Sequence, residues 1–428
     1  MSSTSQTNVT SYRDTKDSAP SVAADDAAGA LMWFGALMLR AGNTATRTRE
    51  WIEVIAGKMG FDTVAVSLSL DSITASVRRS GEWVTTMREI GPPAINAWRI
   101  AELEQLARTL RPGCAPHDIA VKLAEIESTA HQYSPLQIAT AVGLASGGFA
   151  FINGAAALEM AAAAIGGGLG QWLRMWLSRR QFNQFGAAVL SAVAASGAFV
   201  AAAALGRQAG FEFAHYPAGF IASVLFLVPG FPLVAAFFDL LQYQTVAALS
   251  RLAYGVMILL AVALGLSIVV AVAGIDLSRQ PPLELTYSLK LLLRAVASFV
   301  AGCAFAMSFN ASPRTALAAG LLALGANSLR LGLGDMGMMP APAAFFAALL
   351  IGILAVLADR RFNVPRMAMT VAPVVIMMPG VYAFEMIVLF NHGQMIEALQ
   401  ASALCGFVIG ALAMGLATAR IFLRRDRM

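Results

Sequence analysis

Hydrophobic and polar positions change their pattern near Tyr133. Before this residue, charged side chains recur among apolar ones with helical or alternating spacing, whereas after it apolar residues follow one another in long blocks. A block of about 20 apolar residues is long enough to cross the hydrocarbon core of a bilayer as a helix. The pattern therefore predicts a soluble region followed by a membrane region.

The soluble region is predicted to be a small α+β domain over residues 26–132, on the cytoplasmic side. Helices are expected over 27–39 and 44–59, because Ala41-Gly42 and Gly60 follow them as stop signals. Alternating residues predict strands over 63–69, 72–78 and 83–90, and Gly91-Pro92-Pro93 ends that pattern. Helical spacing returns over 95–110 and 116–131. Residues 1–25 are rich in Ser, Thr, Asp and Ala without an apolar core, which predicts a disordered tail and not a signal peptide.

The membrane region contains ten apolar windows, at residues 135–153, 155–173, 184–206, 217–238, 251–273, 286–309, 313–330, 339–357, 367–390 and 395–418. With the amino terminus inside, inner segments hold Arg174, Arg179, Arg180, Arg251, Arg314, Arg360, Arg361, Arg366, Arg420, Arg424, Arg425 and Arg427, and outer loops hold only Arg207, Arg279 and Arg330. Lys290 and Arg294 blur this bias, which otherwise places both termini in the cytoplasm. We predict a multi-pass inner-membrane protein.

Composition supports the membrane class and narrows the chemistry. Hydrophobic residues make up 58% of the 428 residues and charged ones only 13%, against about 25% charged in soluble domains. The net charge of +5 comes from arginines that flank apolar blocks, so no nucleic-acid partner is expected. Cys114, Cys303 and Cys405 are far apart and the four histidines lack metal spacing, so neither a metal site nor a cofactor is predicted.

Two windows carry the same Pro-Gly interruption. Val228-Pro229-Gly230 lies in the fourth window and Met378-Pro379-Gly380 in the ninth, and the alignment that pairs them also pairs Gln244 with Gln394 and Gly265 with Gly415, without a gap. A repeat with an odd number of spans must be inverted in the membrane. The predicted fold is an α-helical polytopic membrane protein with two inverted five-helix repeats, 133–275 and 284–428, after the α+β domain.

The two interruptions are the predicted centre of a binding site. Proline lacks an amide donor and glycine lets the chain leave helical geometry, so Pro229-Gly230 and Pro379-Gly380 should free backbone groups inside the membrane. Such groups are costly there unless protein, water or a ligand satisfies them. An ordinary proline kink is the alternative.

Several segments together resemble the threonine/serine exporter family. They are the run from Leu39 to Glu50, Val228-Pro229-Gly230 followed by Asp239, Phe309-Asn310-Ala311-Ser312-Pro313-Arg314, and Met378-Pro379-Gly380-Val381-Tyr382. The resemblance implies export of threonine and serine driven by the proton gradient, with both halves fused here and split between two chains in some bacteria. Split relatives are linked to dicarboxylates, so export of succinate is the alternative. After Asn153-Gly154 this chain has Glu159 where an aspartate is more usual in the family.

Polar residues at membrane depth are candidates for function because their insertion is costly. Glu159, Asp239 and Glu385 are predicted to carry coupling protons; the alternatives are an interfacial residue for Glu159, a solvated helix end for Asp239 and a pair with Lys290 or Arg294 for Glu385. Tyr382 is one turn from Glu385 and is predicted, with Asn153 and Asn327, to bind substrate. Hydrogen bonds between helices are the alternative for the two asparagines.

Other functional classes remain for comparison. No phosphate-binding GxxxxGK[ST] loop is present in the sequence, which favours a secondary transporter over a pump, and no catalytic residues or enzyme activity are predicted. Gly332-Leu333-Gly334-Asp335 matches the short signature of intramembrane aspartyl proteases, which would need Asp239 as its second carboxylate. A passive channel would conduct without a proton gradient. The expected partners are threonine, serine, protons and the bilayer, and the sequence leaves open whether copies of the chain form a homo-oligomer.

Overall fold

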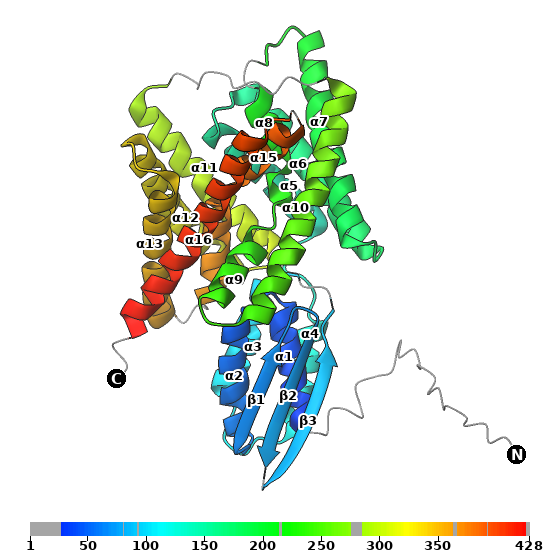
Figure 1. The fold of residues 1–428 in the computed structure, drawn as a ribbon, viewed down its shortest axis with the longest axis vertical. Coiled ribbons are helices and arrows are strands. Elements are labelled where there is room, and N and C mark those ends of the chain that lie inside the picture. Colours follow the sequence, from blue (N-terminus) through cyan, green and yellow to red (C-terminus); the bar gives the residue numbers. More distant parts are fainter. Residues whose placement is uncertain are drawn as a thin grey trace, which may run out of the picture.

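The computed structural model describes residues 27–79, 81–91, 94–213, 216–274, 285–362, 366–391 and 393–424. An α+β region lies against one end of a bundle of long helices (Figure 1). The predicted tail over 1–25, Pro92-Pro93, Arg279, Arg425 and Arg427 lie outside the described residues.

The α+β region, residues 27–128, contains the helices and strands that the pattern predicts. In chain order they are α1 (Ala27–Arg40), α2 (Ala45–Lys58), β1 (Thr63–Leu68), β2 (Ser72–Arg79), β3 (Glu82–Glu89), α3 (Ala97–Thr109) and α4 (Pro116–Ser128). The strands form an antiparallel sheet in the order β1-β2-β3. Alternate residues of β2 are buried, Ile73, Ala75 and Val77, because one face of the sheet packs against the helices and the other meets solvent.

The bundle is built from long apolar helices. They are α5 (Pro135–Ile152), α6 (Ala157–Arg179), α7 (Gln184–Gln208), α8 (Tyr216–Val224), η1 (Leu225–Leu227), α9 (Gly230–Leu240), α10 (Thr245–Ala273), α11 (Tyr287–Ser308), α12 (Pro313–Asp335), α13 (Pro340–Phe362), α14 (Arg366–Ile376), α15 (Gly380–Asn391) and α16 (Met395–Arg424). Among the described residues, seven single helices could cross a membrane, or up to nine spans if each bent pair counts as one. The chain is therefore a multi-pass membrane protein. The predicted count of ten, which includes α6, stays a prediction.

Both Pro-Gly sequences interrupt their helices. The segments on the two sides of Pro229 meet at 61°, and those on the two sides of Pro379 meet at 41°. Several predicted boundaries were wrong: α10 begins at Thr245, α6 continues to Arg179, α7 to Gln208, α12 to Asp335 and α13 to Phe362. Arginines predicted to lie in loops, such as Arg174, Arg251 and Arg330, therefore lie inside helices. Apolar windows miss such residues because a single arginine does not end a helix.

Helix boundaries recur in the two halves of the bundle, in two registers. The alignment that pairs Gly230 with Gly380, here called the Pro-Gly register, pairs the first residues of α9 with α15 and of α10 with α16. A second alignment, here called the Ala157–Pro313 register, pairs the first residues of α6 with α12 and of α7 with α13. The elements from α8 onward follow the Pro-Gly register, which also pairs the first residues of α8 and α14, and the helices α6 and α7 before them follow the other.

Packing contacts between helices recur in the same two registers. A Cβ atom on Gly265 of α10 would lie 2.7 Å from the carbonyl oxygen of Val189 on α7. One on Gly415 of α16 would lie 2.5 Å from the carbonyl oxygen of Phe345 on α13. Gly265 corresponds to Gly415 in the Pro-Gly register, and Val189 corresponds to Phe345 in the Ala157–Pro313 register. The close contact between α10 and α7 is therefore equivalent to the one between α16 and α13.

Candidate functional site

The two helix interruptions lie in direct contact, and the contact is reciprocal. A Cβ atom on Gly230 would meet Cγ of Met378 at 2.8 Å, and one on Gly380 would meet Cδ2 of Leu225 at 2.6 Å and Cγ2 of Val228 at 3.5 Å. Val228 and Met378 are equivalent in the Pro-Gly register. Each glycine therefore packs against residues that precede the other interruption. A larger side chain in its place would push the two interruptions apart.

The backbone repeats through both interruptions. The amide of Gly230 donates to the carbonyl of Val228 at 2.8 Å, and the amide of Gly380 donates to that of Met378, also at 2.8 Å. Regular helical hydrogen bonding resumes with Leu233 bonded to Pro229 and Ala383 bonded to Pro379. The prediction of two matched helix interruptions is thus confirmed.

A small apolar cavity of about 20 Å³ lies where the interruptions meet. Its walls come in equivalent pairs, Phe149 with Phe305, Leu225 with Val375 and Val228 with Met378, together with Gly380. The Phe149 and Phe305 rings pack edge to face with centroids 5.7 Å apart. One water needs about 10–15 Å³ of such volume, so an amino acid does not fit here in this conformation.

A larger cavity of about 140 Å³, the junction cavity, lies between the interruptions and the α+β region. Most of its wall comes from the segment after the first interruption and the segment before the second. The lining residues are Thr44, Arg47, Phe231, Val234, Ala235, Phe238, Gly352, Val356, Thr370, Val371, Val374, Leu416 and Arg420. It is apolar along the helices and carries two guanidinium groups where α2 and α16 meet.

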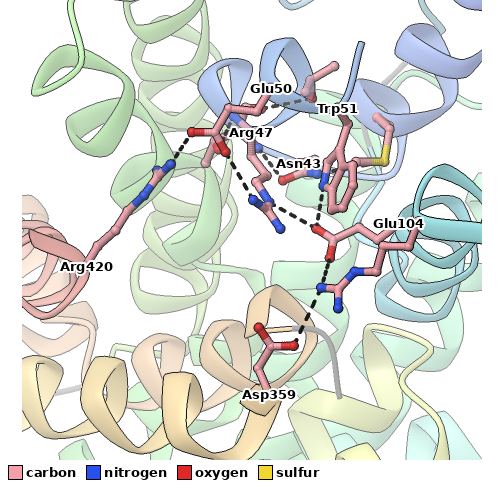
Figure 2. Close-up of polar contacts among 11 residues, drawn as sticks. Asn43, Arg47, Glu50, Trp51, Glu104, Asp359 and Arg420 are labelled. Carbon is pink, nitrogen blue, oxygen red and sulfur yellow. Dashed lines mark hydrogen bonds and ion pairs between the residues drawn. The ribbon is translucent and has the colours of Figure 1, made fainter. Parts of the chain in front are cut away.

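Ion pairs join the α+β region to the bundle beside this cavity (Figure 2). Glu50 of α2 pairs with Arg47 at 3.1 Å and with Arg420 of α16. Glu104 of α3 accepts from the indole of Trp51 at 3.0 Å and pairs with Arg47 at 3.2 Å. Burial disfavours the charge of Arg47, but the carboxylates of Glu104 and Glu50 outweigh that effect and raise its pKa. The guanidinium at the cavity is therefore held in its charged form.

Arg108 extends these contacts to a further helix of the bundle. Its guanidinium lies 3.7 Å from Glu104 and 3.6 Å from Asp359 of α13. Helices α2 and α3 are thus tied to the ends of both α13 and α16, on one side of the junction cavity.

Asp239 fastens the α+β region to the first half of the bundle. Its side chain is completely buried at the end of α9, accepts from the amide of Ala45 at 3.1 Å, and lies 3.2 Å from the guanidinium of Arg251. Arg251 in turn donates to the carbonyl of Asn43 at 2.6 Å. A carboxylate at a helix amino terminus is favoured by the free amides there. The alternative of a solvated helix end was wrong for Asp239; proton coupling remains untested.

Asn310 makes the corresponding attachment from the second half. Its backbone is left-handed, with φ of 56°, and its side chain donates to Asn96 at 3.1 Å and accepts from the amide of Gln132 at 2.7 Å. The neighbouring carbonyl of Phe309 accepts from the amide of Ala97, at the start of α3, at 2.8 Å. The Phe309-Asn310 part of the family-like motif therefore caps a helix of the α+β region.

Glu159 and Glu385 lie on helices other than those that contact the α+β region. Glu159 is 1% exposed in the first turn of α6, and its Cβ lies 2.9 Å from where a Cβ on Gly219 of α8 would be. Glu159 is therefore enclosed by protein, and its depth in the membrane stays a prediction. Glu385 and Tyr382 are half-buried on α15. Lys290 and Arg294 both pair with Asp335, at 3.5 and 2.6 Å.

The two asparagines predicted to bind substrate lie apart from the interruptions. Asn153 is exposed at the end of α5, and its side chain donates to the carbonyl of Phe149 at 2.7 Å. Asn327 is completely buried, donates to Ser298 of α11 at 2.8 Å and accepts from Arg330 at 2.9 Å. Asn327 thus makes the hydrogen bond between helices that was its alternative, and a substrate contact by either asparagine stays a prediction.

The protease alternative lacks its geometry. Asp335 ends α12 beside Arg294 and Lys290, and the opposite end of that helix is the one next to the α+β region. Asp239 lies at the α+β region, against α2. Two carboxylates must share a proton in that chemistry. Within the described ranges, no group of three or more His, Cys, Asp or Glu side chains could hold a metal ion.

Sequence patterns missed the residues at the junction. Arg47, Glu50 and Asn310 belong to segments quoted for the family resemblance, but nothing in their spacing shows that they meet Arg420 and Asn96. Most lining residues of the junction cavity are ordinary apolar residues of helices. Only the tertiary structure shows that they line a cavity.

Comparisons with known families match nearly the whole chain. Residues 30–273 match the family described as "Putative threonine/serine exporter", and residues 294–422 match the family described as "Threonine/Serine exporter, ThrE". The first match alone covers more than half of the chain. No solved structure matches the chain significantly.

Two curated relatives carry related descriptions. A "Probable threonine/serine exporter" of Mycobacterium tuberculosis is 27% identical over 337 residues, which are 75% of this chain and 62% of the relative. A "Threonine/serine exporter" of Corynebacterium glutamicum is 25% identical over 407 residues, 90% of this chain and 78% of the relative. The chain thus spans less than two thirds of the first relative.

Proposed function

The chain belongs to the threonine/serine exporter family, and on that premise we propose that it exports threonine and serine across the bacterial inner membrane by alternating access, driven by the proton gradient. The observation that carries the proposal is the reciprocal contact between Gly230 and the residues before Gly380, and between Gly380 and the residues before Gly230. A transport site between two matched interrupted helices is typical of secondary transporters with inverted repeats.

The proposed architecture has ten spans in two inverted halves, with both termini and the α+β domain in the cytoplasm. Support comes from the ends of α9, α13 and α16 and the turn before α12, all of which contact the α+β region. If ten spans cross the membrane in alternating directions, all four of these positions lie on the same side of it. The arginines at inner positions favour that side as the cytoplasm.

The junction cavity is the proposed cytoplasmic vestibule. It opens beside Arg47 and Arg420, which can attract the carboxylate of an amino acid, and Thr44 and Thr370 offer hydroxyl groups to its polar atoms. The small cavity beyond it is closed by Val228, Met378 and the Phe149–Phe305 pair. Passage then requires the two interruptions to separate, which exposes the backbone around Pro229-Gly230 and Pro379-Gly380 to substrate.

Glu159 and Glu385 are the proposed proton carriers. Asp239 is held by Arg251 and by the amide of Ala45, which fix its side chain to the α+β region. A carboxylate whose surroundings alternate between protein and water can change protonation as the two sides open in turn. We therefore assign Asp239 to the attachment of the cytoplasmic domain.

The test is efflux of labelled threonine, serine and succinate from proteoliposomes, with and without a proton gradient. Val356→Trp, whose side chain lines the junction cavity, should block efflux, and Leu357→Trp, 48% exposed on the bundle surface, should not. Equal efflux by both variants would contradict the vestibule. Gradient-independent efflux would indicate a channel, and efflux of succinate alone would assign the dicarboxylate alternative.

A further inference from the structure

The residues of the junction cavity have counterparts on the far side of the two interruptions. In the Pro-Gly register, Val234, Ala235 and Thr370 correspond to Phe384, Glu385 and Phe220. In the Ala157–Pro313 register, Gly352 of α13 corresponds to Ser196 of α7. This pairing of residues follows from the repeated helix boundaries and packing contacts, so it does not depend on where the membrane lies.

Three of the far-side counterparts are closely packed, and the fourth, Glu385, is half-buried. Ser196 and Phe220 are completely buried and Phe384 is 5% exposed. The Phe220 and Phe384 rings meet edge to face, with centroids 6.2 Å apart, and Phe199 continues the stack at 6.0 Å from Phe220. Two phenyl rings thus occupy the places that valine and threonine hold around the junction cavity.

We infer that Phe220 and Phe384 form the far-side gate of the transport path, and that their separation opens a second cavity that binds the ammonium group of an amino acid through Glu385. The inference rests on the proposed alternating access. Glu385 takes the place of Ala235, so the wall of the second cavity carries a carboxylate, whereas the charged groups of the junction cavity are Arg47 and Arg420 at its mouth. A wall carboxylate attracts an ammonium group and repels a dicarboxylate, which selects amino acids.

The gate accounts for the closed far side in physical terms. In an inverted repeat, each half takes in turn the arrangement that the other half holds, so the cavity on one side forms as its counterpart closes. Each aromatic pair of this kind adds a modest stabilisation beyond that of the apolar area it buries. Such packing keeps the far side closed in this state, and substrate binding can reverse it.

Labelling of introduced cysteines tests the gate. In a background with Cys114, Cys303 and Cys405 replaced by serine, Ser196→Cys should react with a membrane-impermeant thiol reagent added from outside to cells that are exporting threonine. Ser191→Cys is the matched control, because Ser191 is completely buried on the same helix and its counterpart, Ala347, does not line the junction cavity. Faster reaction at position 196 supports the inference, and equal rates overturn it.

A variant with smaller side chains at the gate gives a second test by the same labelling reaction. Phe220→Thr combined with Phe384→Val installs the side chains of the junction-cavity counterparts, and should raise the rate at Ser196→Cys about tenfold if the open state is a minor one in the parent protein. If this protein does not fold, Phe384→Val alone serves, because Phe220 stays in place. An unchanged rate while the parent protein still exports threonine overturns the gate and leaves the proposed function standing. If the parent protein exports neither threonine nor serine, both fail.

Discussion

The Nε atom of Arg251 lies 3.2 Å from Oδ2 of Asp239, and both side chains are buried against the first turn of α2. This pair joins the end of the first interrupted helix to the α+β region. The interruption at Pro229-Gly230 is therefore connected to the α+β region through α9, whose residues from Gly230 to Leu240 run between the two.

Asp239→Ala should loosen this attachment. Removing one partner of a buried ion pair leaves an uncompensated charge and costs about 3–5 kcal/mol, so we expect a lower melting temperature in detergent and faster proteolysis within residues 27–128. The double variant Asp239→Ala, Arg251→Met should recover much of the loss, because no buried charge remains. If Asp239→Asn instead keeps the domain protected and abolishes only proton-coupled efflux, Asp239 is a proton carrier after all.

Gly230→Ala and Gly380→Ala should weaken the protein to a similar extent. The added Cβ would lie 2.8 Å from Met378 in the first and 2.6 Å from Leu225 in the second. Overpacking of this kind costs about 1–3 kcal/mol. Thermal unfolding measures both variants against Gly325→Ala, whose added Cβ meets nothing within 4 Å and should stabilise α12 by about 0.5–1 kcal/mol. A tolerant Gly230 beside a sensitive Gly380 would show that the contact is not reciprocal in solution.

Asn310→Ala should detach the second half of the bundle from α3. The substitution removes the hydrogen bonds to Asn96 and Gln132 and places alanine at a φ of 56°, which only glycine and a few polar residues adopt readily. We expect a loss of about 1–3 kcal/mol from the stranded polar groups. Asn310→Gly separates the causes, because it removes the side chain but suits the left-handed backbone. Equal stability of the alanine and parent proteins in urea unfolding would contradict this.

The stability of the protein should fall slightly in acid through His131. Although His131 is exposed, partial desolvation and then the charges of Arg99 and Arg179 lower its pKa below the usual 6.5. The folded protein therefore binds this proton less readily than the unfolded chain, and stability falls as the pH drops through 6.5 toward the lower folded pKa. His131→Gln should flatten the melting-temperature profile from about pH 7.5 to about pH 5.5, with the parent protein as control. An identical slope in both proteins would assign the acid sensitivity to other groups.

Much of the secondary structure follows from local pattern. The helices and strands of the α+β region lie within about three residues of their predicted ends, because capping, glycine stops and alternation act over a few neighbours. The Pro-Gly register was visible in Pro229-Gly230 and Pro379-Gly380. The Ala157–Pro313 register, which relates α6 to α12, was not, because alanine-rich helices carry little identity to align.

Sequence by itself determined the membrane class, the two helix interruptions and the family resemblance, because apolar length and Pro-Gly chemistry are local properties. Only the tertiary structure decided that Gly230 faces Met378, that Asp239 caps α2, and that Arg47 and Arg420 share Glu50 beside a cavity. Most of these partners are far apart in the sequence, and their meeting depends on how helices pack. Packing is set by the whole bundle together, so no local pattern could reveal it.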